Sequence, residues 1–334
     1  MSEIQRAAVT GGAGFIGSHV ADALVASGIQ TVVVDNFATG REENLKQLAG
    51  RVRVERCDVN EIERLEKVFE GVDCVFHLAA LADIVPSIER PMEYFRANVD
   101  GTASVMEAAR NARVRRVVYA ASSSCYGIPD RYPTAETAEA RPQYPYALTK
   151  YLGEQIALHW GKVYRIPTVA LRLFNVFGVR SRTSGAYGSV FGVFLAQKLA
   201  SRPFTVVGDG TQSRDFTYVT DVARAFVTAA RSDVTGEAIN IGSGRPQTVN
   251  RLVELLGGDV VNVPKRPGEP DCTHADTAKA KALLDWETKI PFEEGVGLVL
   301  DQIDYWRAAP VWDENSIARA TKTWFDQLGE LAST

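Results

Sequence analysis

The sequence has few of the features that mark membrane, nucleic-acid-binding or secreted proteins. No apolar run in its 334 residues approaches the roughly 18 residues of a membrane span, and the first residues lack the cationic start and apolar stretch of a signal peptide. Lys and Arg number 37 against 41 Asp and Glu, a net charge of −4, so no cationic surplus is left for nucleic acid. We therefore expect a cytoplasmic protein that binds neither membranes nor nucleic acid.

The sequence also lacks the spacing of a metal site or a disulfide framework. Cys57, Cys74, Cys125 and Cys272 are far apart and form no CxxC pair, and the four histidines show no HExxH or Cys/His ligand spacing. Hydrophobic residues at 46% and charged residues at 23% are typical of a folded globular chain. The length predicts two domains, or one large α/β domain with an added lobe.

Short β-branched segments alternate with helical patterns in the first half of the chain. The expected strands are Arg6 to Thr10, Thr31 to Asp35, Val52 to Arg56, Cys74 to Ala79 and Arg116 to Ala121. The helical patterns between them include Ile16 to Ser27, Ile62 to Phe69 and Val99 to Asn111. Strands that are apolar on both faces and separated by helices indicate a parallel sheet covered on both sides. The handedness of such crossovers predicts a Rossmann-type, doubly wound α/β sheet.

The pattern becomes less regular in the second half. The expected elements are a long helix over Tyr146 to Trp160, a strand over Thr168 to Phe174, a Gly/Ser-rich loop over 180–189, and strands over Thr205 to Val207 and Ala238 to Gly242. These separated segments predict a smaller, discontinuous α/β domain that binds the substrate. Residues 1–172 and 217–248 would form the dinucleotide-binding domain, and residues 173–216 and 249–334 the substrate domain.

The last segment of the chain predicts an amphipathic helix. Asp313 can cap it, and one face carries Ile317, Thr321, Trp324, Phe325 and Leu328. A helix packed on the protein's own body is the favoured interpretation, and a partner-binding helix is the alternative.

A glycine-rich turn follows the first expected strand. Gly11, Gly14 and Gly17 allow a tight turn and let the backbone approach a pyrophosphate at the N-terminus of the next helix. Asp35 follows Gly17 by 18 residues at the end of the second strand, where a carboxylate can accept hydrogen bonds from ribose hydroxyls. Such a carboxylate repels a 2′-phosphate and favours NAD over NADP, although Arg41 nearby leaves NADP open.

Further cofactor contacts are expected at the ends of the third and fourth strands. Asp58 and Val59 would lie at the adenine, and the segment 78–80 beside the middle of the cofactor. The full set expected at NAD is Gly11, Gly14, Phe15, Ile16, Gly17, Asp35, Asn36, Asp58, Val59, Leu78, Ala79, Ala80, Asn98, Tyr146 and Lys150.

Tyr146 and Lys150 stand four residues apart, so one helix face presents both side chains. An ammonium and a positive nicotinamide ring would stabilise the phenolate, and the pKa of Tyr146 should fall from its usual value near 10. Such a tyrosine can exchange a proton with a substrate hydroxyl while hydride moves. The serines at 122–124, at the end of the fifth strand, would add a third hydroxyl group, with a serine-rich turn as the alternative.

Taken together, these motifs resemble the extended short-chain dehydrogenase/reductase family, and within it nucleotide-sugar epimerases of the UDP-glucose/UDP-N-acetylglucosamine 4-epimerase type. The resemblance covers about residues 5–300 and includes TGGAGFIGSHV, VDNFATG, HLAA, SSSCYG, YALTK, RLFNVFG, GDGTQSRDFTYVTDV and RPGEPDCTHADTAKAKALL. It implies that Ser122, Tyr146 and Lys150 are catalytic, that NAD is the cofactor, and that a homodimer forms through helices near 100–111 and 146–160.

The resemblance also favours one reaction. Family 4,6-dehydratases carry an Asp-Glu pair where this chain has Ser123 and Ser124. The 3,5-epimerase/reductase branch has a cysteine two residues before the counterpart of Tyr126, whereas Cys125 is one residue before it and is interpreted as structural. Among these family reactions, the resemblance therefore favours C4 epimerisation of a UDP-hexose or UDP-N-acetylhexosamine.

The resemblance places the substrate contacts on Ser122, Ser123, Ser124, Asn175, Arg214, Arg266, Glu269 and Thr273. Asn175 would contact the diphosphate, Arg214 and Arg266 would bind its oxygens, and Glu269 would bond the nucleoside ribose. A tyrosine at the position of Thr273 closes the family's pocket to an acetamido group, so Thr273 predicts an open pocket.

Several alternatives stay open. A 4-keto-sugar reductase would use the same residues with net turnover of the cofactor, and a non-catalytic dinucleotide-binding protein would keep only the cofactor site. The nucleotide could be GDP, CDP or dTDP. Arg214 could form an ion pair with Asp215 or Asp221 in place of phosphate.

Overall fold

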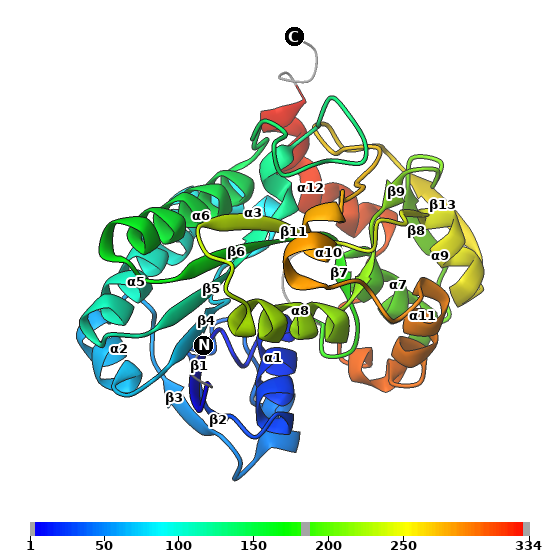
Figure 1. The fold of residues 1–334 in the computed structure, drawn as a ribbon. Coiled ribbons are helices and arrows are strands. Elements are labelled where there is room, and N and C mark those ends of the chain that lie inside the picture. Colours follow the sequence, from blue (N-terminus) through cyan, green and yellow to red (C-terminus); the bar gives the residue numbers. More distant parts are fainter. Residues whose placement is uncertain (1–3, 182–187, 330–334) are drawn as a thin grey trace.

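The computed structural model describes residues 4–181 and 188–329, so most of the loop expected over 180–189 lies outside the described residues. Figure 1 shows a twisted sheet with helices on both faces, and a smaller lobe that carries α7 (Val190–Leu199), α9 (Val249–Leu256) and α11 (Phe292–Leu300). Among the described residues, no helix combines the length and apolar character that crossing a membrane requires.

The central sheet has seven parallel strands in the order β11-β6-β5-β4-β1-β2-β3. Their bounds are β1 (Arg6–Thr10), β2 (Gln30–Asp35), β3 (Arg53–Arg56), β4 (Cys74–His77), β5 (Arg116–Ser122), β6 (Thr168–Leu173) and β11 (Glu237–Ile241). The predicted Rossmann-type sheet is confirmed, and only β4 ends clearly earlier than expected. Because the strand order reverses between β1 and β4, a crevice opens at the carboxyl ends of these strands.

Helices cover both faces of this sheet. One face packs against α1 (Phe15–Ala26), α8 (Val219–Arg231) and α10 (Ala278–Leu284), and the other against α2 (Ile62–Phe69), α5 (Gly101–Asn111) and α6 (Pro145–Tyr164). Alternate residues of one strand enter the two cores: Val9 packs with α1 and α8, and Ala8 packs with α2 and α5. A strand that is buried on both faces has no polar face. This explains why the sequences of these strands are continuously apolar and do not alternate between apolar and polar residues.

The connection between β4 and β5 is divided into several helical segments. It contains α3 (Ile84–Glu89), α4 (Pro91–Phe95) and a π-helical turn, η2 (Arg96–Asp100), which continues into α5. The helix expected from Val99 is therefore the end of this turn and the start of α5. Turns of this kind are frequent at functional sites.

The smaller lobe is built from separated segments around an aromatic core. Its strands are the parallel pair β8 (Phe204–Val207) and β13 (Val260–Val263), and the two-residue pairs β7 (Val176–Phe177) with β10 (Thr217–Tyr218) and β9 (Ser213–Arg214) with β12 (Gln247–Thr248). The rings of Phe177 and Phe191 stack with centroids 4.6 Å apart, and Phe216 stacks on Phe292 at 5.1 Å. The domain boundaries given above stay a prediction.

The predicted C-terminal helix is α12 (Glu314–Leu328), shown in red in Figure 1. The carboxylate of Asp313 accepts a hydrogen bond from the Ser316 N–H at 2.7 Å, so the predicted cap is confirmed. Ile317, Thr321 and Trp324 are buried, and the helix contacts α3. The interpretation of a helix packed on the protein's own body is therefore confirmed.

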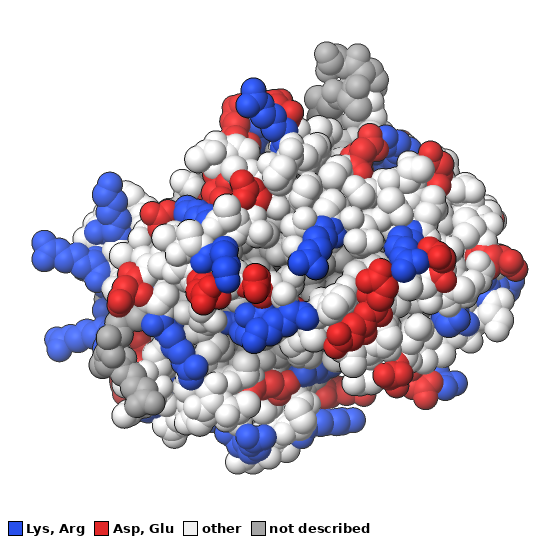
Figure 2. Space-filling model, turned by 45° about the vertical axis from the view of Figure 1, so that its right-hand side comes forward, with Lys and Arg blue, Asp and Glu red and all other residues white. Residues whose placement is uncertain are grey.

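Acidic and basic side chains are interspersed over the face drawn in Figure 2. Many exposed charges are paired: Arg251 forms ion pairs with Glu254 and Glu293, and Lys281 with Asp285. Exposed pairs of this kind contribute little to stability because water screens them.

Candidate active site

A cavity of about 710 Å³ lies at the carboxyl ends of the sheet strands and extends toward the smaller lobe. This volume falls within the range of small-molecule sites. Every site residue predicted from the sequence lines the cavity except Asn98. The fold therefore brings together predicted site residues that are spread from residue 11 to residue 273. From the sequence alone, only their motifs linked them to one site.

The glycine-rich turn gives this cavity an anion-binding end. Gly11 has φ +67°, and its N–H donates to the Val34 carbonyl at 2.8 Å. A Cβ on Gly17 would lie 2.2 Å from the Gly11 carbonyl oxygen, so only glycine fits there. The N-cap of α1 is Gly14, which has no capping side chain, and the first turn carries no acidic residue. The free N–H groups and the positive helix end thus suit a pyrophosphate.

Asp35 ends β2 at the wall of the same cavity. Its two carboxylate oxygens accept hydrogen bonds from the N–H groups of Ala13 at 2.9 Å and Phe37 at 2.7 Å. Burial raises the pKa of Asp35 above its usual value, and these hydrogen bonds oppose that shift. Arg41 forms an ion pair with Glu43 at 2.8 Å, so its charge is already engaged beside the site. Both arrangements favour NAD over NADP.

Asn98 lies behind the cavity and does not line it. Its side-chain oxygen accepts from the Leu81 N–H at 2.8 Å, and its amide donates to the Leu81 carbonyl at 3.0 Å and to Thr149 Oγ1 at 3.0 Å. These bonds fasten the loop after β4 to α6. Asn98 therefore shapes the site by holding Leu81, which does line the cavity.

The predicted catalytic side chains converge at the middle of the cavity. Tyr146 Oη donates to Ser122 Oγ over 3.5 Å, and Ser122 Oγ lies 2.8 Å from Ser124 Oγ. Pro145 begins α6, so Tyr146 and Lys150 lie one turn apart on its cavity side. Lys150 Nζ lies 4.4 Å from the centroid of the Tyr119 ring.

The protein's own residues do not lower the pKa of Tyr146, and the fall expected with bound NAD stays a prediction. Burial raises the pKa of Tyr146, and the hydrogen bond with Ser122 only partly opposes this shift. Burial also lowers the pKa of Lys150 to about 7, against the opposing influence of Glu154. Desolvation disfavours the charged form of both groups, and it outweighs the hydrogen bond from Tyr146 to Ser122 and the charge of Glu154 near Lys150.

Two arginines and a glutamate form the opposite end of the cavity. Glu269 forms ion pairs with Arg214 at 2.8 Å and with Arg266 at 2.8 Å. The alternative partners of Arg214 are engaged elsewhere, because Asp215 accepts from Ala275 N–H, among other donors, and Asp221 pairs with Arg224. Two guanidinium groups against one carboxylate leave a net positive charge, which suits phosphate oxygens.

Thr273 is fixed at the wall of this end by two hydrogen bonds. Its hydroxyl donates to Asn175 Oδ1 at 2.7 Å and accepts from the Asp215 N–H at 2.9 Å. The side chain is small and lines the cavity. Asn175 is in turn oriented by Thr273, so the two residues act as one unit.

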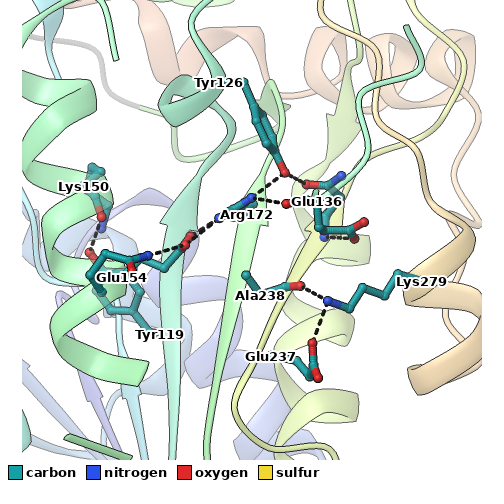
Figure 3. Close-up of polar contacts among 11 residues, drawn as sticks. Tyr119, Tyr126, Glu136, Lys150, Glu154, Arg172, Glu237, Ala238 and Lys279 are labelled. Carbon is teal, nitrogen blue, oxygen red and sulfur yellow. Dashed lines mark hydrogen bonds and ion pairs between the residues drawn. The ribbon is translucent and has the colours of Figure 1, made fainter. Parts of the chain in front are cut away.

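The close-up in Figure 3 shows how the turn after Ser122 is held. Arg172 donates to both carboxylate oxygens of Glu154, at 2.8 and 2.7 Å, and to Tyr126 Oη at 2.8 Å. Tyr126 donates to Asn240 Oδ1 at 2.7 Å. The neighbouring Cys125 is buried outside the cavity lining, and burial raises its pKa to about 12, in keeping with a structural role.

Sequence reasoning missed several residues of the cavity wall. Asp83, Tyr144, Trp312 and Trp324 line it. The two tryptophans follow the segment that resembles the family, so no motif marked them. Tyr144 could have been found from its place two residues before Tyr146. In the described ranges 4–181 and 188–329, no group of three or more His, Cys, Asp or Glu side chains could hold a metal ion.

Comparisons with known proteins agree with this geometry. One curated relative is a putative UDP-glucose 4-epimerase of Methanocaldococcus jannaschii, 34% identical over 88% of this chain and 96% of its own length. Another is a UDP-N-acetyl-alpha-D-glucosaminuronate decarboxylase of Bacillus cytotoxicus, 30% identical over 87% of this chain and 95% of its own length. Among solved structures, the UDP-glucose 4-epimerase of Thermotoga maritima with UDP-glucose has a TM-score of 0.84 and 33% identity, and the match covers 91% of this chain and 99% of that chain. The UDP-N-acetylglucosamine 4-epimerase of Methanobrevibacter ruminantium with UDP-N-acetylmuramic acid also has a TM-score of 0.84 and 33% identity, and the match covers 90% of this chain and 99% of that chain.

The model of the NAD dependent epimerase/dehydratase family matches residues 7–242, which confirms the resemblance inferred from the motifs. The glycine turn, Asp35 and the cavity they form fit the cofactor of that family. This chain is therefore an enzyme of the NAD-dependent epimerase/dehydratase family.

Proposed function

We propose that the chain catalyses C4 epimerisation of a UDP-hexose or UDP-N-acetylhexosamine. The observation that carries this proposal is that one cavity holds the Tyr146–Ser122 pair between a pyrophosphate-binding turn and the Arg214–Arg266 pair. A nucleotide sugar held at its diphosphate by the arginines would place its hexose near Tyr146. UDP-sugars appear in the names of both solved relatives described above.

The cofactor would be held by the first turn and by Asp35. The N–H groups at the start of α1 would bind its pyrophosphate, and Asp35 its adenosine ribose. When bound, NAD supplies a hydride acceptor that later returns the hydride, and a positive charge that favours the phenolate form of Tyr146.

The chain's own residues would handle the proton. Tyr146 Oη would accept the proton of the 4-hydroxyl and later return it to the 4-oxygen, after the sugar has turned its opposite face toward the site. Ser122, which is already hydrogen-bonded to Tyr146, would hold the 4-oxygen in line with it. The 4-keto sugar formed between the two transfers must rotate to present its other face. The sugar therefore has to be bound more loosely than the diphosphate.

Three other reactions of the family are alternatives to epimerisation. A dehydratase needs an acid and a base where Ser123 and Ser124 provide only hydroxyl groups. Decarboxylation needs a substrate with a carboxylate, and a relative named for that reaction is 30% identical to this chain. A 4-keto-sugar reductase would use the same residues but consume reduced cofactor.

The test is incubation of the purified protein with NAD and, separately, UDP-glucose, UDP-N-acetylglucosamine, UDP-glucuronate, and GDP-, CDP- and dTDP-glucose. We expect NMR spectra to show the C4 epimer of a UDP-sugar with no net change in reduced NAD. Release of carbon dioxide from UDP-glucuronate, or steady consumption of reduced cofactor with a 4-keto sugar, would replace epimerisation with the corresponding reaction.

Substrate choice is predicted to depend on Thr273. In a Thr273→Tyr variant the phenol would fill the wall of the sugar site, and we expect the N-acetylhexosamine activity to fall on the order of tenfold more than the hexose activity. Comparison of kcat/KM for the two substrates measures this. Thr273→Val is the matched control, because it removes the bonds to Asn175 and Asp215 without adding bulk. Equal loss of both activities in Thr273→Tyr would contradict the prediction.

We also propose that the chain forms a homodimer. Met92, Phe95, Leu148 and Val163 are exposed apolar residues on α4 and α6, two helices that contact each other. Exposed apolar side chains on neighbouring helices are typical of an interface between subunits. We expect light scattering to give the mass of two chains.

A Leu148→Arg variant is expected to shift this assembly toward the mass of one chain, because it places a charge within the proposed interface. Leu148 is 45% exposed, and Val54 on the edge strand β3 is 43% exposed, so Val54→Arg is the matched control. A wild-type protein with the mass of one chain would refute the proposed dimer.

A further inference from the structure

The C-terminal segment contributes to the cavity although it lies beyond the resemblance. The two solved relatives described above cover 91% and 90% of this chain. The resemblance in sequence ends near residue 300. Ala309, Pro310, Trp312 and Trp324 nevertheless line the cavity.

Trp324 connects α12 to the loop that carries Arg266. Its indole N–H donates to the Pro267 carbonyl at 2.8 Å, and the guanidinium of Arg266 lies 5.3 Å from the centroid of its ring. Trp324 is 3% exposed, so it has little surface left for a ligand. Its contact with the cavity therefore acts mainly through its neighbours.

The indole also contacts Tyr144, the N-cap residue of the helix that carries Tyr146. The rings of Trp324 and Tyr144 lie 6.2 Å apart, and Tyr144 stacks on Tyr146 with centroids 6.3 Å apart and an interplanar angle of 8°. A row of three aromatic rings thus joins Arg266 to Tyr146.

The helix is also anchored on the dinucleotide-binding side. It packs against α3, and Thr323 Oγ1 donates to Glu89 Oε1 at 3.4 Å. The loop that precedes α3 lines the cavity at Asp83. α12 therefore bridges the two sides of the site and holds the Arg266 loop at a set distance from the catalytic tyrosine.

We propose that Trp324 is a positioning residue that holds Arg266 toward the diphosphate of the nucleotide sugar. The inference rests on the proposed function, because it takes a nucleoside diphosphate as the ligand. An arginine stacked on an indole loses less conformational freedom on binding than a free one, which strengthens a bidentate contact with phosphate. The ion pair with Glu269 also holds Arg266, but that pair competes with phosphate.

The test measures binding of UDP itself by calorimetry, alongside steady-state kinetics. In Trp324→Leu we expect the Kd for UDP to rise on the order of tenfold, with KM for the UDP-sugar rising by a similar factor and kcat changing far less. Trp324→Phe keeps an aromatic ring under Arg266 and should recover most of the affinity. It also keeps the test valid if Trp324→Leu fails to fold.

Trp286 offers a matched control. Its indole N–H donates to the Asp221 carbonyl at 3.1 Å, the guanidinium of Arg224 lies 5.5 Å from its ring, and it does not line the cavity. Trp286→Phe repeats the chemical change of Trp324→Phe away from the site, so its Kd for UDP should equal that of the wild type.

A double-mutant cycle separates positioning from general stability. If Trp324 acts through Arg266, then Trp324→Leu should change the Kd for UDP little once Arg266 is replaced by Ala. Additive losses, or wild-type affinity for UDP in Trp324→Leu, would overturn the inference while leaving the proposed function intact. A wild-type protein that binds neither UDP nor any UDP-sugar would instead refute the proposed function, and this inference with it.

Discussion

A Tyr146→Phe variant is expected to lose about a hundredfold to ten-thousandfold in kcat, the range usual for a general acid–base group. The substitution removes one oxygen, which donates to Ser122 Oγ at 3.5 Å, and keeps the ring that stacks on Tyr144. The shape of the cavity should therefore persist. KM for the sugar nucleotide and the Kd for NAD should change only a few-fold, because Arg214, Arg266 and the glycine turn are untouched.

Tyr164→Phe is the matched control for this variant. Tyr164 is the last residue of the same helix and is exposed. The guanidinium of Arg110 lies 4.2 Å from the centroid of its ring, a contact that phenylalanine preserves. Its kcat should equal that of the wild type. If Tyr146→Phe kept more than about a tenth of the wild-type kcat, another group would have to move the proton.

The sequence predicted the dinucleotide half of the fold well because its signals are local. Glycines required by a turn and a close approach, an aspartate at a strand end, and β-branched runs each follow from the backbone of a few adjacent residues. Gly17 illustrates this, since the space left for a Cβ is decided by Gly11, six residues earlier.

Contacts between distant segments were harder to predict. The assignment of Glu269 to a ribose stays a prediction, but the sequence did not reveal that its carboxylate lies between Arg214 and Arg266. Asn98 was assigned to the cofactor, whereas it holds the backbone of Leu81. Motif spacing identifies which residues lie at the site. The hydrogen-bond or ion-pair partner of each side chain depends on how the loops pack in the folded chain.

Two further features depend on burial, which a sequence does not show. The helical pattern of α12 predicted that Trp324 faces inward. It did not reveal that Trp324 contacts Arg266 and Tyr144. Spacing along a helix also shows the ammonium near Tyr146 but not the loss of water around both groups, which raises the pKa of Tyr146 among the protein's own residues.

The buried network of Figure 3 leads to the largest expected effect on stability. Glu154 is 1% exposed, and Arg172 is the cation that neutralises it, with two hydrogen bonds of 2.8 and 2.7 Å. An Arg172→Leu variant leaves this carboxylate buried and unpaired, which costs about 3–5 kcal/mol in the free energy of unfolding. Urea denaturation followed by circular dichroism measures the loss.

A control and a rescue accompany Arg172→Leu. Lys279, also drawn in Figure 3, forms an ion pair with Glu237 at 2.7 Å near the surface, so Lys279→Met should cost no more than about 1 kcal/mol. The double variant Arg172→Leu, Glu154→Leu should regain much of the lost stability, because two apolar side chains replace the unpaired charge. A double variant no more stable than Arg172→Leu would show that the bond from Arg172 to Tyr126, and not the buried carboxylate, dominates the energy of this network.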